Sequence, residues 1–183
     1  MECNDKIIFT LNDTDINLDY KEKKDYKGRI SARGIVIDND GKIALQYKIK
    51  KNQYKLVGGG IEGNETPIAG FKREVLEESG CQIEIISELG KVEEFRNFLD
   101  LKQTSYIFVA KVINNTHILK LTEKEKNEEA KILWLSPKNA LETIRKCYDK
   151  LRPSEYDNIF DTQFDVVRDI KILEYYLESF DKV

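Results

Sequence analysis

The 183-residue chain predicts an α/β fold, a mixed β-sheet flanked by helices with an added helix at the C-terminus. Several segments alternate between apolar and polar residues, as half-buried strands do, whereas residues 67–79 and 162–180 carry apolar residues at helical spacing. Turn residues between neighbouring strands indicate hairpins, so we expect a mixed sheet and not a wholly parallel one. The length fits one domain with short extensions.

The first 27 residues are expected to form an N-terminal extension, because they are polar apart from the short run Ile7-Ile8-Phe9. The strongest turn signal, Asp38-Asn39-Asp40-Gly41, separates the next two predicted strands. The predicted strands span residues 30–38, 42–48, 54–57, 82–95, 104–113 and 131–136. Residues 114–129 are polar, and we expect them to form a long loop.

The clearest helix is predicted over residues 67–79. Its apolar residues recur at helical spacing: Ile68, Phe71 and Val75. Thr66 is a favourable N-cap, Pro67 suits the first helical position, and Gly80 is a typical stop. Both ends of this helix are therefore predicted as well as its length.

Two more helices are predicted towards the C-terminus. Ser136-Pro137 begins one over residues 137–148. The other, over residues 162–180, has an apolar stripe that must be buried: Phe164, Val167, Ile170, Leu173, Tyr176 and Leu177. We therefore expect a central domain at residues 28–148 and a helical extension at 149–183, which packs on that domain or on the second subunit of a homodimer.

The composition excludes several classes of protein. With 30 basic and 33 acidic residues the net charge is −3, so we expect no stable binding of nucleic acid. Cys3, Cys81 and Cys147 are far apart, as in a cytoplasmic protein with reduced thiols. The single histidine, His117, rules out a zinc site with two or three histidines and is expected to be solvated. We see neither a signal peptide nor an apolar run long enough to span a membrane.

The residues that indicate chemistry lie between Gly58 and Cys81. Glu74, Glu77 and Glu78 share one face of the predicted helix, and Arg73 is spaced to pair with Glu77. A solvated acidic face would explain a Glu-rich helix by itself. The repulsion between three like charges would, however, be relieved by a hard divalent cation such as Mg²⁺. The preceding Gly58-Gly59-Gly60 would also let a ligand approach the backbone closely.

These residues resemble the Nudix box, GX5EX7REUXEEXGU, in which U is a bulky aliphatic residue. The match runs from Gly59 through Glu65 and Arg73-Glu74-Val75-Leu76-Glu77-Glu78 to Cys81, and every fixed residue is present. Cys81 replaces the last aliphatic residue, which we interpret as a change in packing. Val57 replaces a proline that is common before the glycines. The resemblance implies the α/β/α sandwich of the MutT-like Nudix hydrolases.

The resemblance also implies roles for residues of the box. It suggests that Glu74 and Glu78 are the principal metal ligands, with Glu77 and the carbonyl oxygen of Gly58 beside them. Arg73 would orient the carboxylates, and Glu65 would pair with Arg73. The implied cofactor is Mg²⁺, with Mn²⁺ as the alternative. The general base varies within the family and could be a box glutamate or a later one.

The later candidates for the base are Glu123, Glu125, Glu128 and Glu129. We favour Glu128 or Glu129, at the end of the polar loop, although a solvated charge run is the simpler interpretation of all four. Arg152 and Arg168 are candidates for a phosphate contact, and ion pairs with acids such as Glu155 or Asp169 are again the simpler alternative.

The implied reaction is hydrolysis of a phosphoanhydride bond in a nucleoside diphosphate linked to a group X. Markers typical of other subfamilies are missing, so a nucleoside triphosphate is the leading substrate. ADP-ribose or a nucleotide sugar is the alternative, and a domain that senses nucleotides without cleaving them is another. An isoprenoid diphosphate isomerase is disfavoured by the single histidine. Aromatic residues that could stack on a base are Tyr47, Tyr54, Phe95, Phe98, Tyr106 and Trp134, although packing is the simpler role for each.

Overall fold

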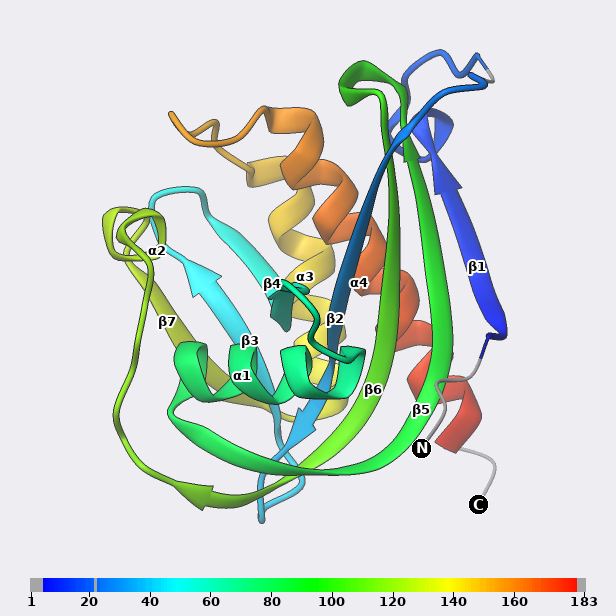
Figure 1. The fold of residues 1–183 in the computed structure, drawn as a ribbon. Coiled ribbons are helices and arrows are strands. Elements are labelled where there is room, and N and C mark those ends of the chain that lie inside the picture. The colour runs from blue at the N-terminus through cyan, green and yellow to red at the C-terminus, as the bar shows by residue number, and fades with distance from the viewer. Residues whose placement is uncertain (1–4, 22, 181–183) are drawn as a thin grey trace.

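The computed structural model describes residues 5–21 and 23–180. Seven strands form one sheet in the order β1-β5-β6-β2-β4-β3-β7 (Figure 1). Strand β1 pairs with β5, and β2 with β6, in parallel; the other pairs are antiparallel. The strands are β1 (Ile7–Asn12), β2 (Lys27–Ile37), β3 (Ile43–Lys48), β4 (Gln53–Gly60), β5 (Cys81–Arg96), β6 (Leu101–Asn115) and β7 (Ala130–Leu135). The predicted mixed sheet is confirmed.

Helices cover both faces of this sheet, as expected for an α/β/α sandwich. Helix α1 (Pro67–Ser79) packs on one face through Phe71 and Val75. Helices α3 (Pro137–Cys147) and α4 (Ile159–Phe180) pack on the other face (Figure 1). No helix within residues 5–21 and 23–180 has the length and apolar character needed to cross a bilayer.

The ends of α1 are those that the sequence predicts. The Thr66 hydroxyl accepts a hydrogen bond from the backbone N–H of Ala69 at 3.2 Å, and Pro67 is the first helical residue. Gly80 ends the helix with a φ of 72°, a conformation that costs glycine little. Because both ends are fixed locally, the acidic face of α1 keeps a defined position along the sheet.

Residues 114–129, expected to be a loop, contain the short helix α2 (Glu123–Asn127). Thr122 and Glu125 form a reciprocal capping box that stabilises this helix locally. The preceding strand also runs two residues longer than predicted, to Asn115. His117 is exposed with a φ of 57°, in agreement with its predicted place in a solvated loop.

The segments before and after the central domain both pack on it. Strand β1 adds a parallel edge to the sheet, so this part of the predicted N-terminal extension is not separate from the core. Helix α4 starts three residues earlier than predicted. Of the expected apolar stripe Phe164 and Leu173 are buried and the others half-buried, while Val166 and Ile172, outside the stripe, are also buried. The proposed division at residues 28 and 149 stays a prediction. Cys81 and Cys147 are free and buried, and Cys3 lies outside the described residues.

Candidate active site

Helix α1 crosses the end of β4 and places Glu78 against the glycine segment. The Glu78 side chain is 3% exposed, and its Oε2 accepts a hydrogen bond from the backbone N–H of Gly58 at 3.0 Å. Its Oε1 accepts a second one, at 2.9 Å, from the amide of Gln46 on β3. Burial raises the pKa of Glu78 to about 7, although the positive charge of Lys55 opposes this shift.

Arg73 connects the loop after β4 to the other carboxylates of α1. It donates to Glu65 at 2.8 and 3.1 Å, to Glu74 at 2.9 Å and to Glu77 at 3.1 Å. A further hydrogen bond, of 2.9 Å, reaches the carbonyl oxygen of Gly60. The hydrogen bonds from Arg73 lower the pKa of Glu65. Arg73 therefore fixes the glycine loop and three box carboxylates relative to one another.

Oxygen atoms at the end of β4 and on α1 form a site that suits a cation. The Lys55 ammonium lies 3.2 Å from the carbonyl oxygen of Gly58 and 3.2 Å from Oε1 of Glu78. These are two of the groups that the Nudix resemblance implies as metal ligands, and hard oxygen donors suit Mg²⁺ or Mn²⁺. Across the described ranges, no three acidic side chains form a ready-made metal cluster. Arg73 holds Glu74 and Glu77, so the full ligand set stays a prediction.

The structure brings Glu125, and not Glu128 or Glu129, next to the box. The amide of Gln46 donates to Glu78 at 2.9 Å and to Glu125 at 3.0 Å, so it bridges the two carboxylates. Glu128 is buried in an ion pair of 2.7 Å with Lys48, and Glu129 is exposed. Our preference for Glu128 or Glu129 as the base therefore finds no geometric support. Burial raises the pKa of Glu125, but hydrogen bonds from Thr122 and Gln46 outweigh it and lower the pKa to about 2.

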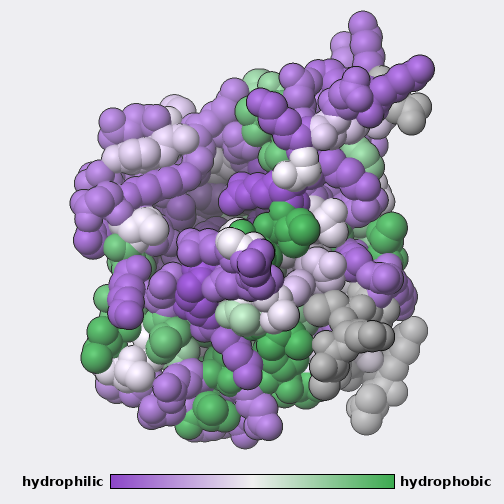
Figure 2. All heavy atoms as spheres, viewed as in Figure 1, coloured by the Kyte–Doolittle hydropathy of each residue, from purple (hydrophilic) through white to green (hydrophobic). Residues whose placement is uncertain are grey.

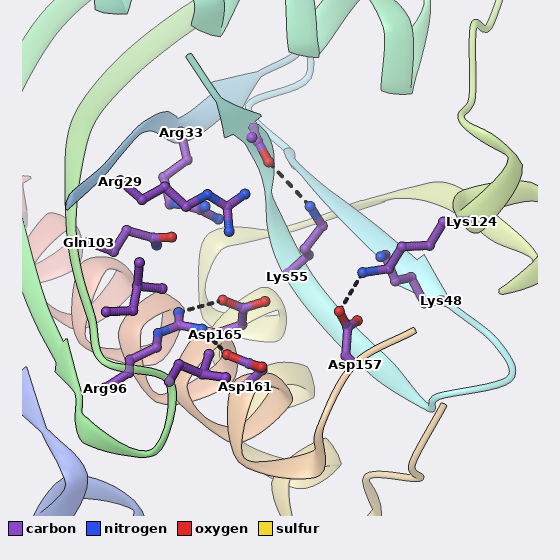
Figure 3. Close-up of a pocket in the computed structure, with 14 residues that line it drawn as sticks. Arg29, Arg33, Lys48, Lys55, Arg96, Gln103, Lys124, Asp157, Asp161 and Asp165 are labelled. Atoms are coloured by element: carbon purple, nitrogen blue, oxygen red, sulfur yellow. Dashed lines mark hydrogen bonds and ion pairs between the residues drawn. The ribbon is translucent and has the colours of Figure 1, made fainter. Parts of the chain in front are cut away.

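A pocket of about 220 Å³ extends from Gly58 and Gly59 towards the start of α4. In the space-filling view the surface above α1 is hollowed, and its surroundings are mostly hydrophilic (Figure 2). Three acids at or before α4 line the far side of the pocket: Asp157, Asp161 and Asp165. Six cations also line it: Arg29, Arg33, Lys48, Lys55, Arg96 and Lys124 (Figure 3). This excess of positive charge beside the acidic helix favours an anionic ligand.

An ion-pair network joins α4 to β5 beneath this pocket. Arg168 is fully buried and donates to Asp169 at 2.8 Å and to Asp165 at 2.9 Å. Arg96 donates to Glu94 at 2.7 Å and to Asp165 at 3.0 Å. The ion-pairing interpretation of Arg168 was correct, but the pairs are buried and not on the surface. Arg152 is exposed and does not line the pocket.

None of the six candidate aromatic residues lines the pocket. Tyr47 and Tyr54 stack on each other with ring centroids 4.1 Å apart, and Phe98 packs edge-on against Phe160. Phe95 contacts Tyr26 in the same edge-on manner. These contacts agree with the packing role and give no platform for a nucleobase within the pocket.

Several residues of the pocket were not predicted from the sequence. On β2, Arg29 and Arg33 are an even number of residues from Ile35, so all three side chains point to the same face of the sheet. Two charged residues on a strand face that is apolar further along the strand could have marked them as candidates for the site. Lys55 gave no such signal, because only the approach of α1 to β4 brings it to Glu78.

Comparison with known proteins places this geometry in context. A family model described as the NUDIX domain matches residues 27–154. A "MutT-like protein" of Streptomyces ambofaciens is 25% identical over 119 residues, which are 65% of this chain and 71% of that protein.

Solved structures share the fold at low identity. A NUDIX hydrolase from Nitrosomonas europaea superposes with a TM-score of 0.60 at 17% identity, covering 86% of this chain and 96% of that one. A UDP-X diphosphatase has a TM-score of 0.51 at 15% identity, covering 86% of this chain and 66% of that one.

Proposed function

This chain belongs to the NUDIX domain family and is a hydrolase, and we propose that it cleaves a phosphoanhydride bond in a nucleoside diphosphate linked to X. The observation that carries the proposal is the position of Glu78. Its buried carboxylate accepts a hydrogen bond from Gly58, which lines the cationic pocket, and Gln46 connects it to Glu125. Acidic groups beside a phosphate-binding pocket are the arrangement that metal-assisted phosphoryl chemistry requires.

We propose that Glu74, Glu78 and the carbonyl oxygen of Gly58 hold the divalent ion, with Glu77 beside them. Mg²⁺ or Mn²⁺ suits these oxygen donors, and when bound it would neutralise the negative charge that develops on the phosphoryl oxygens. Arg73 and Glu65 orient the metal ligands, because Arg73 donates hydrogen bonds to both Glu65 and Glu74. The contact of the Lys55 ammonium with Gly58 and Glu78 supports a cation site at this point.

Glu125 is our proposed general base for the attacking water. The support for this role is the position of Glu125, which shares the Gln46 amide with Glu78. Its pKa of about 2 keeps the carboxylate ionised at neutral pH but makes it a weak base. Glu78, with a pKa of about 7, is in a different protonation state, and such a separation is typical of carboxylates with distinct roles. Gln46 fixes the distance between the two.

A nucleoside triphosphate is the first substrate to test, in keeping with the MutT-like relative. A nucleotide sugar or ADP-ribose is the second, because the polar pocket is lined by no aromatic residue. We expect the enzyme to act on a small molecule in the cytoplasm, without stable nucleic-acid binding. A homodimer through residues 149–183 stays a prediction.

The test is release of phosphate or pyrophosphate from nucleoside triphosphates, nucleotide sugars and dinucleoside polyphosphates, with Mg²⁺, with Mn²⁺ and with chelator. We expect metal-dependent turnover of one class, reduced by orders of magnitude in Glu78→Gln and in Glu77→Gln. Glu142→Gln is the matched control, because Glu142 is on α3, where it pairs with Lys146. Tight binding without turnover would replace the hydrolase proposal by the sensor. Normal turnover in both box variants would exclude a metal site on this face of α1.

A further inference from the structure

Two arginines of the pocket have no ion-pair partner within residues 5–21 and 23–180, Arg33 in a buried position and Arg29 in an exposed one. Arg29 and Arg33 are four residues apart on β2 and point into the same hollow (Figure 3). Arg33 is 5% exposed, and its Nε has no hydrogen-bond partner. In the part of the chain that the structure describes, neither arginine makes an ion pair. The other four cations are paired, in Lys48–Glu128, Lys55–Glu78, Arg96–Asp165 and Lys124–Asp157.

A buried guanidinium without a partner is unfavourable, because it has lost its hydration and gained no compensating charge. Burial and the positive charge of Arg168 lower the pKa of Arg33, and the acids of α4 and β5 offset only part of this shift. The nearby Asp165 is already bonded to Arg96 and Arg168, at 3.0 and 2.9 Å. An anion from outside the protein would supply the missing partner, and the planar guanidinium suits two oxygens of a phosphoryl group.

The position of Arg33 ties this charge to the proposed reaction site. Arg33 lies opposite Gly58 in the ladder between β2 and β4, and a β-carbon at Gly58 would stand 2.6 Å from that of Arg33. The Arg29 guanidinium is near Gly60, one residue beyond Gly59 on the same strand. A ligand held at Gly58 and Gly59 would therefore meet both arginines.

We infer that Arg29 and Arg33 form a subsite for a phosphoryl group carried by X, so that X is a phosphate or a phosphorylated, non-aromatic group. This inference rests on the proposed function for the statement that the anion belongs to the substrate. The uncharged side chains that line the pocket are Gln103, Leu99 and Leu101. An amide and two aliphatic side chains suit a sugar phosphate or a terminal phosphate better than a stacked base.

Binding of inorganic tripolyphosphate in the presence of chelator tests the subsite without catalysis. By calorimetry, we expect Arg33→Met to weaken binding at least about tenfold, as loss of one charge-assisted contact predicts. Arg33→Lys should recover part of the affinity. The control Arg145→Gln removes the same charge from α3, where Arg145 pairs with Glu174, and should bind as the wild type does. Wild-type affinity in Arg33→Met would overturn the subsite.

The unliganded variant gives a second readout. Arg33→Met should melt at or above the temperature of the wild type, because it removes an unpaired buried charge, and tripolyphosphate should no longer raise that temperature. A melting temperature well below that of the wild type would show that Arg33 has a structural partner, and would overturn the argument from unpaired charge.

Kinetics then assign the phosphoryl group to X. Arg33→Met should raise KM at least about tenfold for a nucleoside triphosphate, in which X is phosphate, and less than about twofold for a nucleotide hexose, in which X is uncharged. An equal rise for both would place the arginines on the diphosphate itself and overturn the assignment. Arg33-dependent binding of tripolyphosphate by an enzyme that hydrolyses no member of the panel would support the subsite and overturn the proposed function.

Discussion

The carboxylate of Glu74 lies directly against the α-carbon of Gly59. A β-carbon at position 59 would stand 2.5 Å from Cδ of Glu74 and 2.6 Å from each of its oxygens. Gly59 has no positive φ, so the glycine is required here by the close approach of the carboxylate and not by the backbone conformation. The strand and the helix thus meet through a glycine and a candidate metal ligand.

Gly59→Ala should therefore impair the site more than the fold. The added methyl group displaces the end of a flexible side chain, so we expect a loss of stability within about 1 kcal/mol. Displacing Glu74 by about 1 Å should lower turnover on the order of a hundredfold. Chemical denaturation and metal-dependent turnover measure the two effects. Gly28→Ala, whose β-carbon would meet nothing within 4 Å, is the control, and equal activity in both variants would contradict the argument.

Burial of Glu78 should make stability depend on pH. Its pKa is about 7 in the folded protein and near 4.5 when unfolded, so the folded state holds the proton more tightly. The stabilisation is complete below about pH 4.5 and is lost as the pH rises through about 7, a change of roughly 3 kcal/mol. Denaturant unfolding between pH 4 and 8, without metal, should show this fall in the wild type. If Glu78→Gln shows the same fall in stability with rising pH, other groups cause that fall.

Metal binding should release a proton from the same carboxylate. Near pH 7 about half of the Glu78 side chains are protonated, and a cation requires the ionised form. We expect release of about half a proton per Mn²⁺ at pH 7, and affinity that rises with pH up to about 8. Calorimetry in buffers of different ionisation enthalpy measures the release. Glu78→Gln should release none, and release equal to that of the wild type would assign the proton elsewhere.

Glu125 and Glu128 should fail in different ways when each is changed to glutamine. Glu125→Gln removes the proposed base, so kcat should fall about 10²- to 10⁴-fold. Stability should fall by about 1–2 kcal/mol, because the hydrogen bonds that lower the pKa of Glu125 also hold α2. Glu128→Gln removes the partner of buried Lys48, so stability should fall by about 3–5 kcal/mol. Turnover per folded molecule and denaturant unfolding separate these effects. Loss of turnover in a stable Glu128→Gln protein would restore Glu128 as the base.

Arg168 should stabilise the contact between α4 and the sheet. Arg168→Met leaves the fully buried Asp169 without its ion-pair partner, whereas Glu94 keeps Arg96, so we expect a loss of about 3–5 kcal/mol. Asp169 also accepts a hydrogen bond of 2.7 Å from the backbone N–H of Leu56 on β4, which links this network to the strand of the glycines. Arg145→Gln, which removes a more exposed pair, should cost less than about 1 kcal/mol. Similar unfolding midpoints for both variants would refute this role.

Local patterns predicted the elements well because their causes are local. Thr66, Pro67 and Gly80 each act on backbone groups within a few residues, and the predicted bounds of α1 are those observed. The sequence also marked the acids of α1, whose spacing places them on one face. Helix α2 was missed, although Thr122 and Glu125 carried a capping signal, because the segment was interpreted by its polarity.

By itself the sequence determined the family, the mixed sheet and the acidic helix, since periodicity, caps and a fixed motif depend on neighbours along the chain. Only the tertiary structure decided which later glutamate reaches the box, because Gln46 connects Glu78 to Glu125 across three separate elements. It also decided that Arg33 is buried without a partner while Arg168 is buried with three. Burial and charge pairing are set by segments far apart in the chain, and for that reason the sequence could not reveal them.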